Sequence, residues 1–253
     1  MIERRFSVGN APEVSVRVQS GRIELVEGKP GEIKASVVTK DPNFVVEQRG
    51  DLIELHHDSE SGWSSKRAEV FLEVPPGTGA TLRAASAEIS GQVVLGKVDI
   101  KTASGDVELK GADKLVIKSA SGDTTVDRVT NALRFTAASG DLHVLDGVGG
   151  SIVASTASGD IRIGETDAIV ELNTVSGDAT IDRFVGRHAS IKSMSGSVDI
   201  GIPAGTRVEL DANLLSGRVS LPPPAPEVTR TGRHMMIKVK SVSGDLTINR
   251  LTD

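Results

Sequence analysis

The stretch SASGDTTV at residues 119–126 decides how this chain folds, because close copies of it return along the sequence. The copies are AASGDLHV at 137–144, TASGDIRI at 156–163, TVSGDATI at 174–181 and SVSGDLTI at 241–248. A Ser-Gly step recurs at nine glycines, which are Gly91, Gly105, Gly122, Gly140, Gly159, Gly177, Gly196, Gly217 and Gly244. Most of them are about 18 residues apart, and such a period predicts a repeat architecture.

Apolar residues stand at fixed distances from each of these glycines. They lie two and four positions after it, as Leu142 and Val144 do, and five and seven positions before it, as Phe135 and Leu133 do. The positions between them are mostly polar. Alternation with period two predicts two short strands per repeat, each with one buried face. No segment has apolar residues at helical spacing, so we expect an all-β chain.

Two architectures fit a two-strand unit of about 18 residues. In a β-solenoid each repeat is one coil and equivalent positions stack. In an antiparallel β meander the Ser-Gly step would be a hairpin loop. Small residues three positions before the glycine favour the solenoid, because a tight coil corner requires them; these are Thr102, Ser119, Ala137, Thr156, Thr174 and Ser193.

The first 75 residues follow the pattern less strictly. We expect residues 1–75 to form an N-terminal β module that caps a solenoid domain at residues 76–253, since an open solenoid end exposes strand edges. The segment VPPGTGA at 74–80 marks the boundary.

Composition excludes several function classes. The net charge of −5 and the lack of a long basic run argue against nucleic acid as a partner. Without cysteine the chain has no disulfide framework and no thiolate metal site. No run of 18 apolar residues is present, so we expect no membrane span. The N-terminal stretch does not have the pattern of a signal peptide, which favours the cytoplasm, with envelope association as the alternative.

The chain resembles the bacterial putative-adhesin family of β-strand-repeat proteins, a domain family of unknown function. The resemblance covers nearly the whole chain. It is carried by SGRIEL, by VFLEVPPGTGATLRAASAEISGQV, by the repeated SASGD and TASGD turns, and by IGIPAGTRVELDANLLSGRV. It implies a β-solenoid-like fold and envelope or stress-response settings, and it supplies no reaction and no catalytic residues.

The aspartates that follow the glycines allow two interpretations. Asp106, Asp123, Asp141, Asp160 and Asp178 could form a ladder that binds Ca²⁺ between coils. They could equally accept backbone N–H groups at the bend. The sequence favours turn chemistry, because the calcium repeat G-G-x-G-x-D is absent.

Few other residues suggest a site. His56 and His57 alternate on a strand, which favours a solvated strand end over a metal site. No nucleophile has a consistent histidine partner and only one tryptophan is available to hold a sugar, so we expect no catalytic residues and no cofactor. Two loops interrupt the repeat and are candidate contacts for a protein partner; they contribute Trp63, and Pro222, Pro223, Pro224, Arg233 and His234.

These observations predict a non-enzymatic scaffold or adhesin-like interaction module. Two alternatives stay open: a protein that self-assembles into oligomers or filaments through its solenoid ends, and a polysaccharide-active enzyme.

Overall fold

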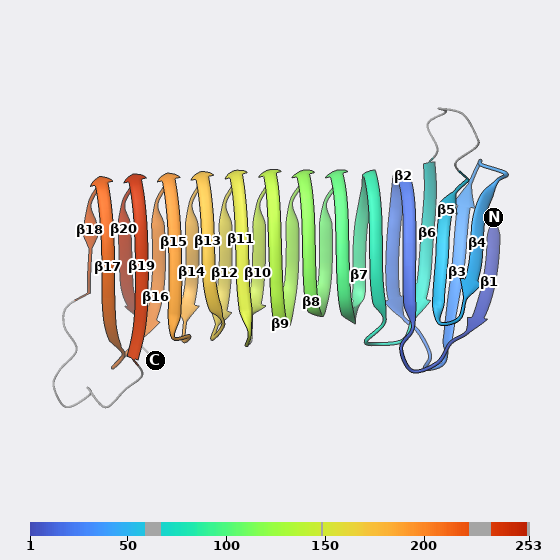
Figure 1. Ribbon diagram of the computed structural model, residues 1–253, viewed down its shortest axis with the longest axis horizontal. Helices are drawn as coiled ribbons and strands as arrows, with labels where there is room; N and C mark the ends of the chain where they lie inside the picture. Colours follow the sequence, from blue (N-terminus) through green and yellow to red (C-terminus); the bar gives the residue numbers. More distant parts are fainter. Residues whose placement is uncertain (59–66, 148, 223–233, 252–253) are drawn as a thin grey trace. The chain divides into compact units, whose positions relative to one another are not determined.

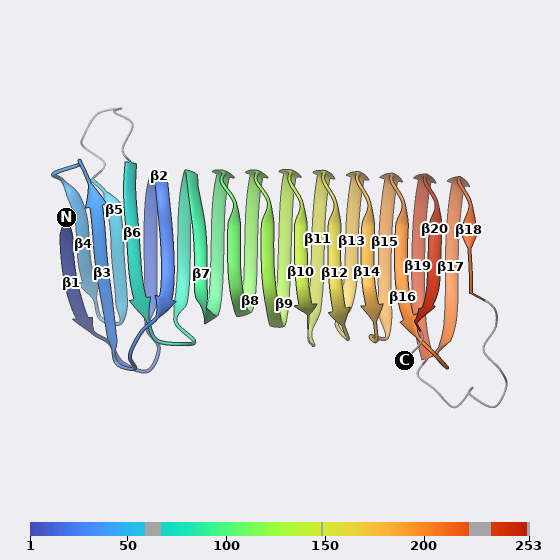
Figure 2. The same ribbon diagram turned by 180° about the vertical axis from the view of Figure 1, so that it is seen from behind.

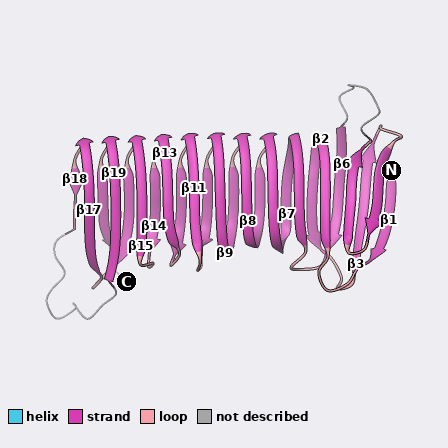
Figure 3. Ribbon diagram, viewed as in Figure 1, coloured by secondary structure: helices cyan, strands magenta, loops and turns pink. Residues whose placement is uncertain are grey.

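The computed structural model describes residues 1–58, 67–147, 149–222 and 234–251. Within these ranges every regular element is a β-strand, which confirms the all-β prediction (Figure 3). The chain divides into two compact units, Met1–Asp127 and Arg128–Asp253, which we describe one after the other.

The first unit combines parallel and antiparallel strands. The strands that lie wholly within it are β1 (Ile2–Ser7), β2 (Glu13–Glu27), β3 (Glu32–Thr39), β4 (Phe44–Arg49), β5 (Leu52–His57), β6 (Arg67–Val74), β7 (Gly79–Ser104) and β8 (Val107–Ser121). Strand β2 is parallel to β7 on one side and to β5 and β6 on the other, and β7 is parallel to β8. Strand β3 is antiparallel to β1 and β6, and β4 is antiparallel to β5 (Figure 1).

The second unit consists of parallel coils. Its strands are β9 (Thr124–Ser139), which begins just before the unit, β10 (Leu142–Gly147), β11 (Ser151–Ser158), β12 (Ile161–Thr166), β13 (Ile169–Ser176), β14 (Ala179–Phe184), β15 (His188–Ser195), β16 (Val198–Pro203), β17 (Arg207–Ser216), β18 (Val219–Ser220), β19 (His234–Ser243) and β20 (Leu246–Leu251). Each coil gives one strand to each of two sheets. Figure 1 shows them from one side and Figure 2 from the opposite side. Equivalent strands of neighbouring coils pair in parallel. Parallel pairing confirms the solenoid and excludes a meander here.

The last two coils of the second unit do not stack in chain order. Strand β19 pairs with β15 on one side and with β17 on the other, and β20 lies in the same way between β16 and β18 (Figure 1). The final coil of the described chain is therefore an inner coil. The coil of β17 and β18, which precedes it in sequence, is the outermost one.

The core of each unit lies between its sheets and is built of aliphatic side chains. The positions predicted to be buried are buried in the inner coils, including Leu133, Phe135, Leu142 and Val144. Because each apolar layer repeats every coil, about 4.8 Å along the stack, a thin core of valine, isoleucine, leucine and alanine suffices.

One predicted corner is wrong. The sequence places a coil corner at Gly91, but Gly91 pairs with Leu109 inside the sheet. In this coil Ala87 lies beside Gly21, and its carbonyl oxygen faces the corner glycine Gly105. The corner therefore precedes Gly105 by about 18 residues, which makes the period more regular than the Ser-Gly steps alone indicate.

Candidate interaction surface

Most coils turn at a Ser-Gly step, where the backbone leaves no room for a side chain. Gly177 has a φ of 141°, and a Cβ at this position would lie 2.1 Å from the carbonyl oxygen of Gly159 in the preceding coil. The small residue three positions before the glycine closes the turn, as Thr156 does by donating its hydroxyl to Ser158 O at 3.2 Å. Thr156 is itself buried. Thr102 and Ser119 make the same bond in their coils.

The aspartate after the glycine binds the next coil. In each case Oδ1 accepts a backbone N–H from the equivalent residue of the neighbouring coil. The bonds run from Asp123 to Asp106 at 3.0 Å, from Asp160 to Asp141 at 2.8 Å, from Asp178 to Asp160 at 2.8 Å, from Ser197 to Asp178 at 2.7 Å and from Arg218 to Asp245 at 2.8 Å. This ladder gives the aspartates a structural role. In the described ranges no three histidine, aspartate or glutamate side chains are grouped so that they could hold a metal ion. Calcium binding stays the untested alternative to turn chemistry.

The position two residues before the corner glycine carries an exposed apolar stripe in the second unit. It holds alanine at Ala157 and then, in four successive coils of the stack, Val175, Met194, Val242 and Leu215. The exposed fractions of these four side chains are 49%, 55%, 47% and 82%. We call these four residues the apolar stripe.

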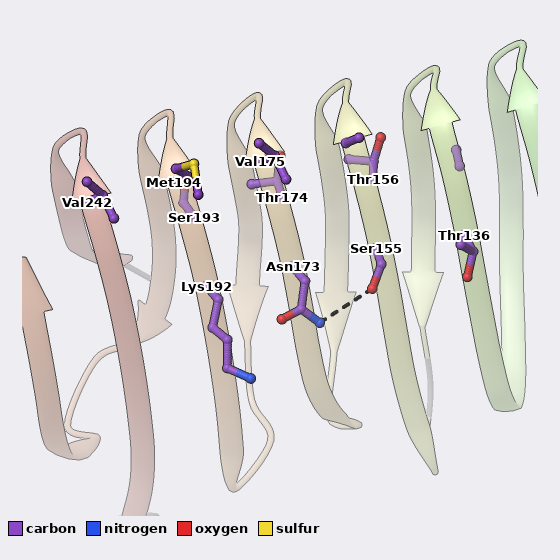
Figure 4. Close-up of a pocket in the computed structure, with 12 residues that line it drawn as sticks. Thr136, Ser155, Thr156, Asn173, Thr174, Val175, Lys192, Ser193, Met194 and Val242 are labelled. Carbon is purple, nitrogen blue, oxygen red and sulfur yellow. Dashed lines mark hydrogen bonds between the residues drawn. The ribbon is translucent and has the colours of Figure 1, made fainter.

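Val175, Met194 and Val242 of the stripe line a shallow groove of about 440 Å³, which Figure 4 shows. Its floor contains Thr174, whose Oγ1 is buried and has no hydrogen-bond partner, whereas the equivalent hydroxyl of Thr156 is bonded. Further along the strands Asn173 Nδ2 donates to Ser155 Oγ at 3.4 Å.

Charges of opposite sign border the stripe. On the strand side Lys192 and Lys240 are register partners on β15 and β19, and both are exposed. On the corner side Asp178 and Asp245 are exposed members of the aspartate ladder. Lys192 also lies 3.8 Å from Glu171 Oε1, and the corner position of the outermost coil holds the exposed Arg218. Beside Met194 and Val242 the stripe therefore has lysines on its strand side, and the aspartates lie on its corner side, so a partner with the reverse arrangement would be favoured.

The histidine pair differs from the sequence prediction. A solvated strand end is wrong for His57, whose side chain is 9% exposed, with Nδ1 2.8 Å from Asp41 Oδ2. The ring of Phe44 meets it edge-on, with centroids 4.9 Å apart. The buried His57–Asp41 pair joins β5 to the segment between β3 and β4.

The loop residues predicted to contact a partner are only partly described. Trp63, Pro223, Pro224 and Arg233 lie outside the described residues. Pro222 is half-buried and His234 is exposed, with Nε2 3.5 Å from Glu209 Oε2. His234 also lines a cleft of about 880 Å³ together with Asp167, Arg187 and His188. The structure thus brings His234 to a cleft lined by both charged and apolar side chains, which the sequence did not indicate.

Sequence reasoning missed the apolar stripe, although a signal was present. The residue two positions before the glycine is alanine in the copies at 119–126, 137–144 and 156–163, and it becomes valine, methionine or leucine in the later ones. Comparing the copies at this outward position would have found it. Their adjacency in space could not be found in this way, because it depends on the order in which the coils stack.

The parallel coils, the glycine corners and the aspartate ladder define a β-solenoid repeat protein. Within that class the chain belongs to the Toastrack DUF4097 family, which matches residues 12–250. Family membership confirms the resemblance inferred from the sequence motifs. A comparison with curated proteins gives no match.

Several solved structures are similar to the chain over most of its length. A putative adhesin from Bacteroides fragilis is 12% identical with a TM-score of 0.45, and the match covers 97% of this chain and 96% of that one. A putative adhesin from Parabacteroides merdae is 10% identical with a TM-score of 0.36, covering 98% and 95%. A putative lipid binding protein from Parabacteroides distasonis is 14% identical with a TM-score of 0.39, covering 99% and 96%.

Among the described elements none is a helix that is long and apolar enough to cross a membrane.

Proposed function

We propose that the chain is a non-enzymatic scaffold or adhesin-like interaction module that binds a protein partner through the apolar stripe. One observation carries this proposal: four large apolar side chains are exposed in adjacent coils of a unit whose inner coils bury their inward positions fully. Isolated exposed apolar residues are ordinary, but a contiguous row with charged borders is typical of an interaction site. Burial of such a row on binding would release about 25 cal/mol for each Å² of apolar surface.

The test compares two variants that carry the same change at similar exposure. Met194→Asp places a charge in the stripe. Leu145→Asp places it on the outward face of β10, where Leu145 is 47% exposed and belongs to no stripe. Both variants and the parent chain are immobilised, and the proteins retained from native lysate are quantified. We expect Met194→Asp alone to lose the specifically retained proteins. Equal retention by the parent chain and Met194→Asp would contradict the proposal.

We also propose that residues 1–75 act as the cap predicted from the sequence. The support lies within the first unit, where the antiparallel strands β1, β3 and β4 all fall in this segment. Deletion of 1–75 should then lower solubility and expose apolar surface to the dye ANS.

Self-assembly through a solenoid end is a second candidate function, favoured by the outermost coil of the second unit. In the described residues β17 pairs with β19 alone. The inward-facing Val219 and Leu221 of this coil are 44% and 55% exposed. An unpaired strand edge beside apolar side chains is a template for another strand. Leu210→Lys should abolish end-to-end particles in negative-stain micrographs, and their persistence would exclude this route.

A further inference from the structure

We propose that the partner of the apolar stripe is a second copy of this chain, placed side by side with a two-fold axis parallel to the direction in which the coils of the second unit stack. The inference rests on the proposed function, because it names the partner of the same surface. Three properties of the stripe lead to it: its repeat distance, the sign of its borders and its size.

The repeat distance of the stripe favours a partner with the same repeat. Neighbouring coils are about 4.8 Å apart, so the stripe presents one large side chain at each such step. An α-helix laid along it would present a turn about every 5.4 Å and would drift out of step over the four coils. A second copy has the same spacing and stays in step along the whole row.

The borders select the orientation of the two copies. A two-fold axis along the stack turns the basic border of one copy over the acidic border of the other. Lys240 then faces the partner's Asp245, and Lys192 lies between the partner's Asp178 and Asp245. A two-fold axis perpendicular to the stack and centred on the stripe would instead set Lys192 over the partner's Lys240, which like-charge repulsion disfavours, and would bring Asp178 near the partner's Arg218. The parallel arrangement pairs Lys240 with an aspartate and avoids the contact between lysines, so it is the one that we expect.

The parallel two-fold axis also sets each stripe residue opposite its own copy. Met194 meets Met194 of the partner subunit, and Val175 meets Val175 of the partner subunit. In the perpendicular arrangement centred on the stripe, Val175 would meet Leu215 of the partner subunit instead, because these two residues stand at its opposite ends. This difference can be measured.

The size of the stripe sets the expected affinity. Stable interfaces bury about 800 Å² on each partner, and a row four coils long with two charged borders is smaller. We therefore expect a reversible dimer with a Kd on the order of 10 to 100 μM. Salt should weaken it, because the border charges stay close to solvent.

The first experiment is sedimentation velocity of the full chain from low micromolar to submillimolar concentration. The parent chain and the control Leu145→Asp should shift from monomer to dimer over this range, while Met194→Asp and Val242→Asp should raise the Kd roughly tenfold or more. Lys192→Glu combined with Lys240→Glu should also weaken the dimer without touching the apolar row. A parent chain that stays monomeric throughout, or dimerisation that all these variants leave unchanged, overturns the proposal.

The second experiment determines the orientation. The chain has no cysteine, so single introduced cysteines are free of background. Facing sheets lie about 10 Å apart, beyond the reach of a disulfide, so a short bismaleimide is the cross-linker. Val175→Cys alone should form cross-linked dimers, and so should Leu215→Cys alone. Cross-linking only when these two variants are mixed would overturn the parallel arrangement, and Leu145→Cys serves as the negative control.

These results separate this inference from the proposed function. If Met194→Asp loses proteins from the lysate but the purified chain is monomeric, the stripe binds a different partner and only the second-copy proposal fails. If Met194→Asp changes neither retention nor sedimentation, both proposals fail.

Discussion

The outer strands of the first unit and the outermost coil of the second unit each end a stack of strands. They differ in how far they bury the apolar face at that end. In the first unit the antiparallel strands β3 and β4 extend the sheets beyond β6 and β5, and Ile33 on β3 and Ile53 on β5 are fully buried. In the second unit the coil of β17 and β18 has a described neighbour on one side only, and Leu221 stays 55% exposed. A coil cannot bury its own inward face, so burial at an end depends on what is added beyond the repeat.

The largest effect should come from core truncation at the two ends. Leu55→Ala removes a fully buried side chain of β5 and should lower the free energy of unfolding by about 3 kcal/mol. Leu210→Ala removes a half-buried side chain of the outermost coil and should cost less than about 1 kcal/mol, because solvent already reaches it. Urea denaturation measures both. Equal losses would show that the outermost coil is packed as tightly as the first unit.

Substitution of a corner glycine should destabilise the protein more in an inner coil than in the outermost coil. A Cβ at Gly177 would clash with Gly159 O at 2.1 Å, and a Cβ at Gly217 would clash with Gly244 O at 2.0 Å. Gly177 has a coil on each side, so Gly177→Ala should cost roughly 2 to 3 kcal/mol. The coil of Gly217 can shift outward, and Gly217→Ala should cost about 1 kcal/mol. The difference in thermal melting point between the two variants tests this, and a larger drop for Gly217→Ala would contradict it.

Ion pairs should follow the same order with smaller effects. Asp41→Ala leaves the buried Nδ1 of His57 without its carboxylate and should cost roughly 1 to 3 kcal/mol. The pair of Asp211 on the outermost coil and Lys238 on the neighbouring coil is exposed, with 3.2 Å between Oδ2 and Nζ. Asp211→Ala should therefore cost less than about 0.5 kcal/mol. Chemical denaturation of the two variants at one pH provides the comparison. A larger loss of unfolding free energy for Asp211→Ala than for Asp41→Ala would contradict the prediction.

The smallest effect on stability is expected within the apolar stripe. Met194→Asp changes a side chain that is 55% exposed, so the free energy of unfolding should stay within about 0.5 kcal/mol of the parent value. Any loss of binding by this variant then reports on the surface and not on the fold. A large destabilisation would instead mean that the stripe supports the stack.

Much of the fold was predictable because the repeat pattern is visible in short stretches of the sequence. Each strand pair shows its alternation within a few residues of the glycine, and the buried positions around Gly140 and Gly159 could be assigned without knowledge of distant contacts. The corner at Ala87 was missed because its coil lacks the glycine, while a misleading Ser-Gly step lies four residues further on. Pattern recognition fails where one coil solves the turn with a different residue.

The stacking order and the His57–Asp41 pair could not be predicted from the sequence. All coils share one pattern, so any coil can stack on any other, and nothing local states that β19 lies between β15 and β17. Asp41 reaches His57 only after β4 and β5 have paired, and such contacts carry no periodic signal. The apolar stripe was predictable in part. Its residues can be identified by comparing the repeats, but that they are neighbours in space depends on the position of β19.

The inner position of β19 and β20 has a consequence for synthesis on the ribosome, which proceeds from the N-terminus. When β17 and β18 have emerged, the coil that will separate them from β15 and β16 has not yet been made. The nascent chain must either hold this coil undocked or dock it on β15 and release it later. In the first unit the order is reversed, because β2 is made before the strands on both its sides and can template them. One unit can therefore grow around an early strand, whereas the other completes its stack only when its last residues arrive.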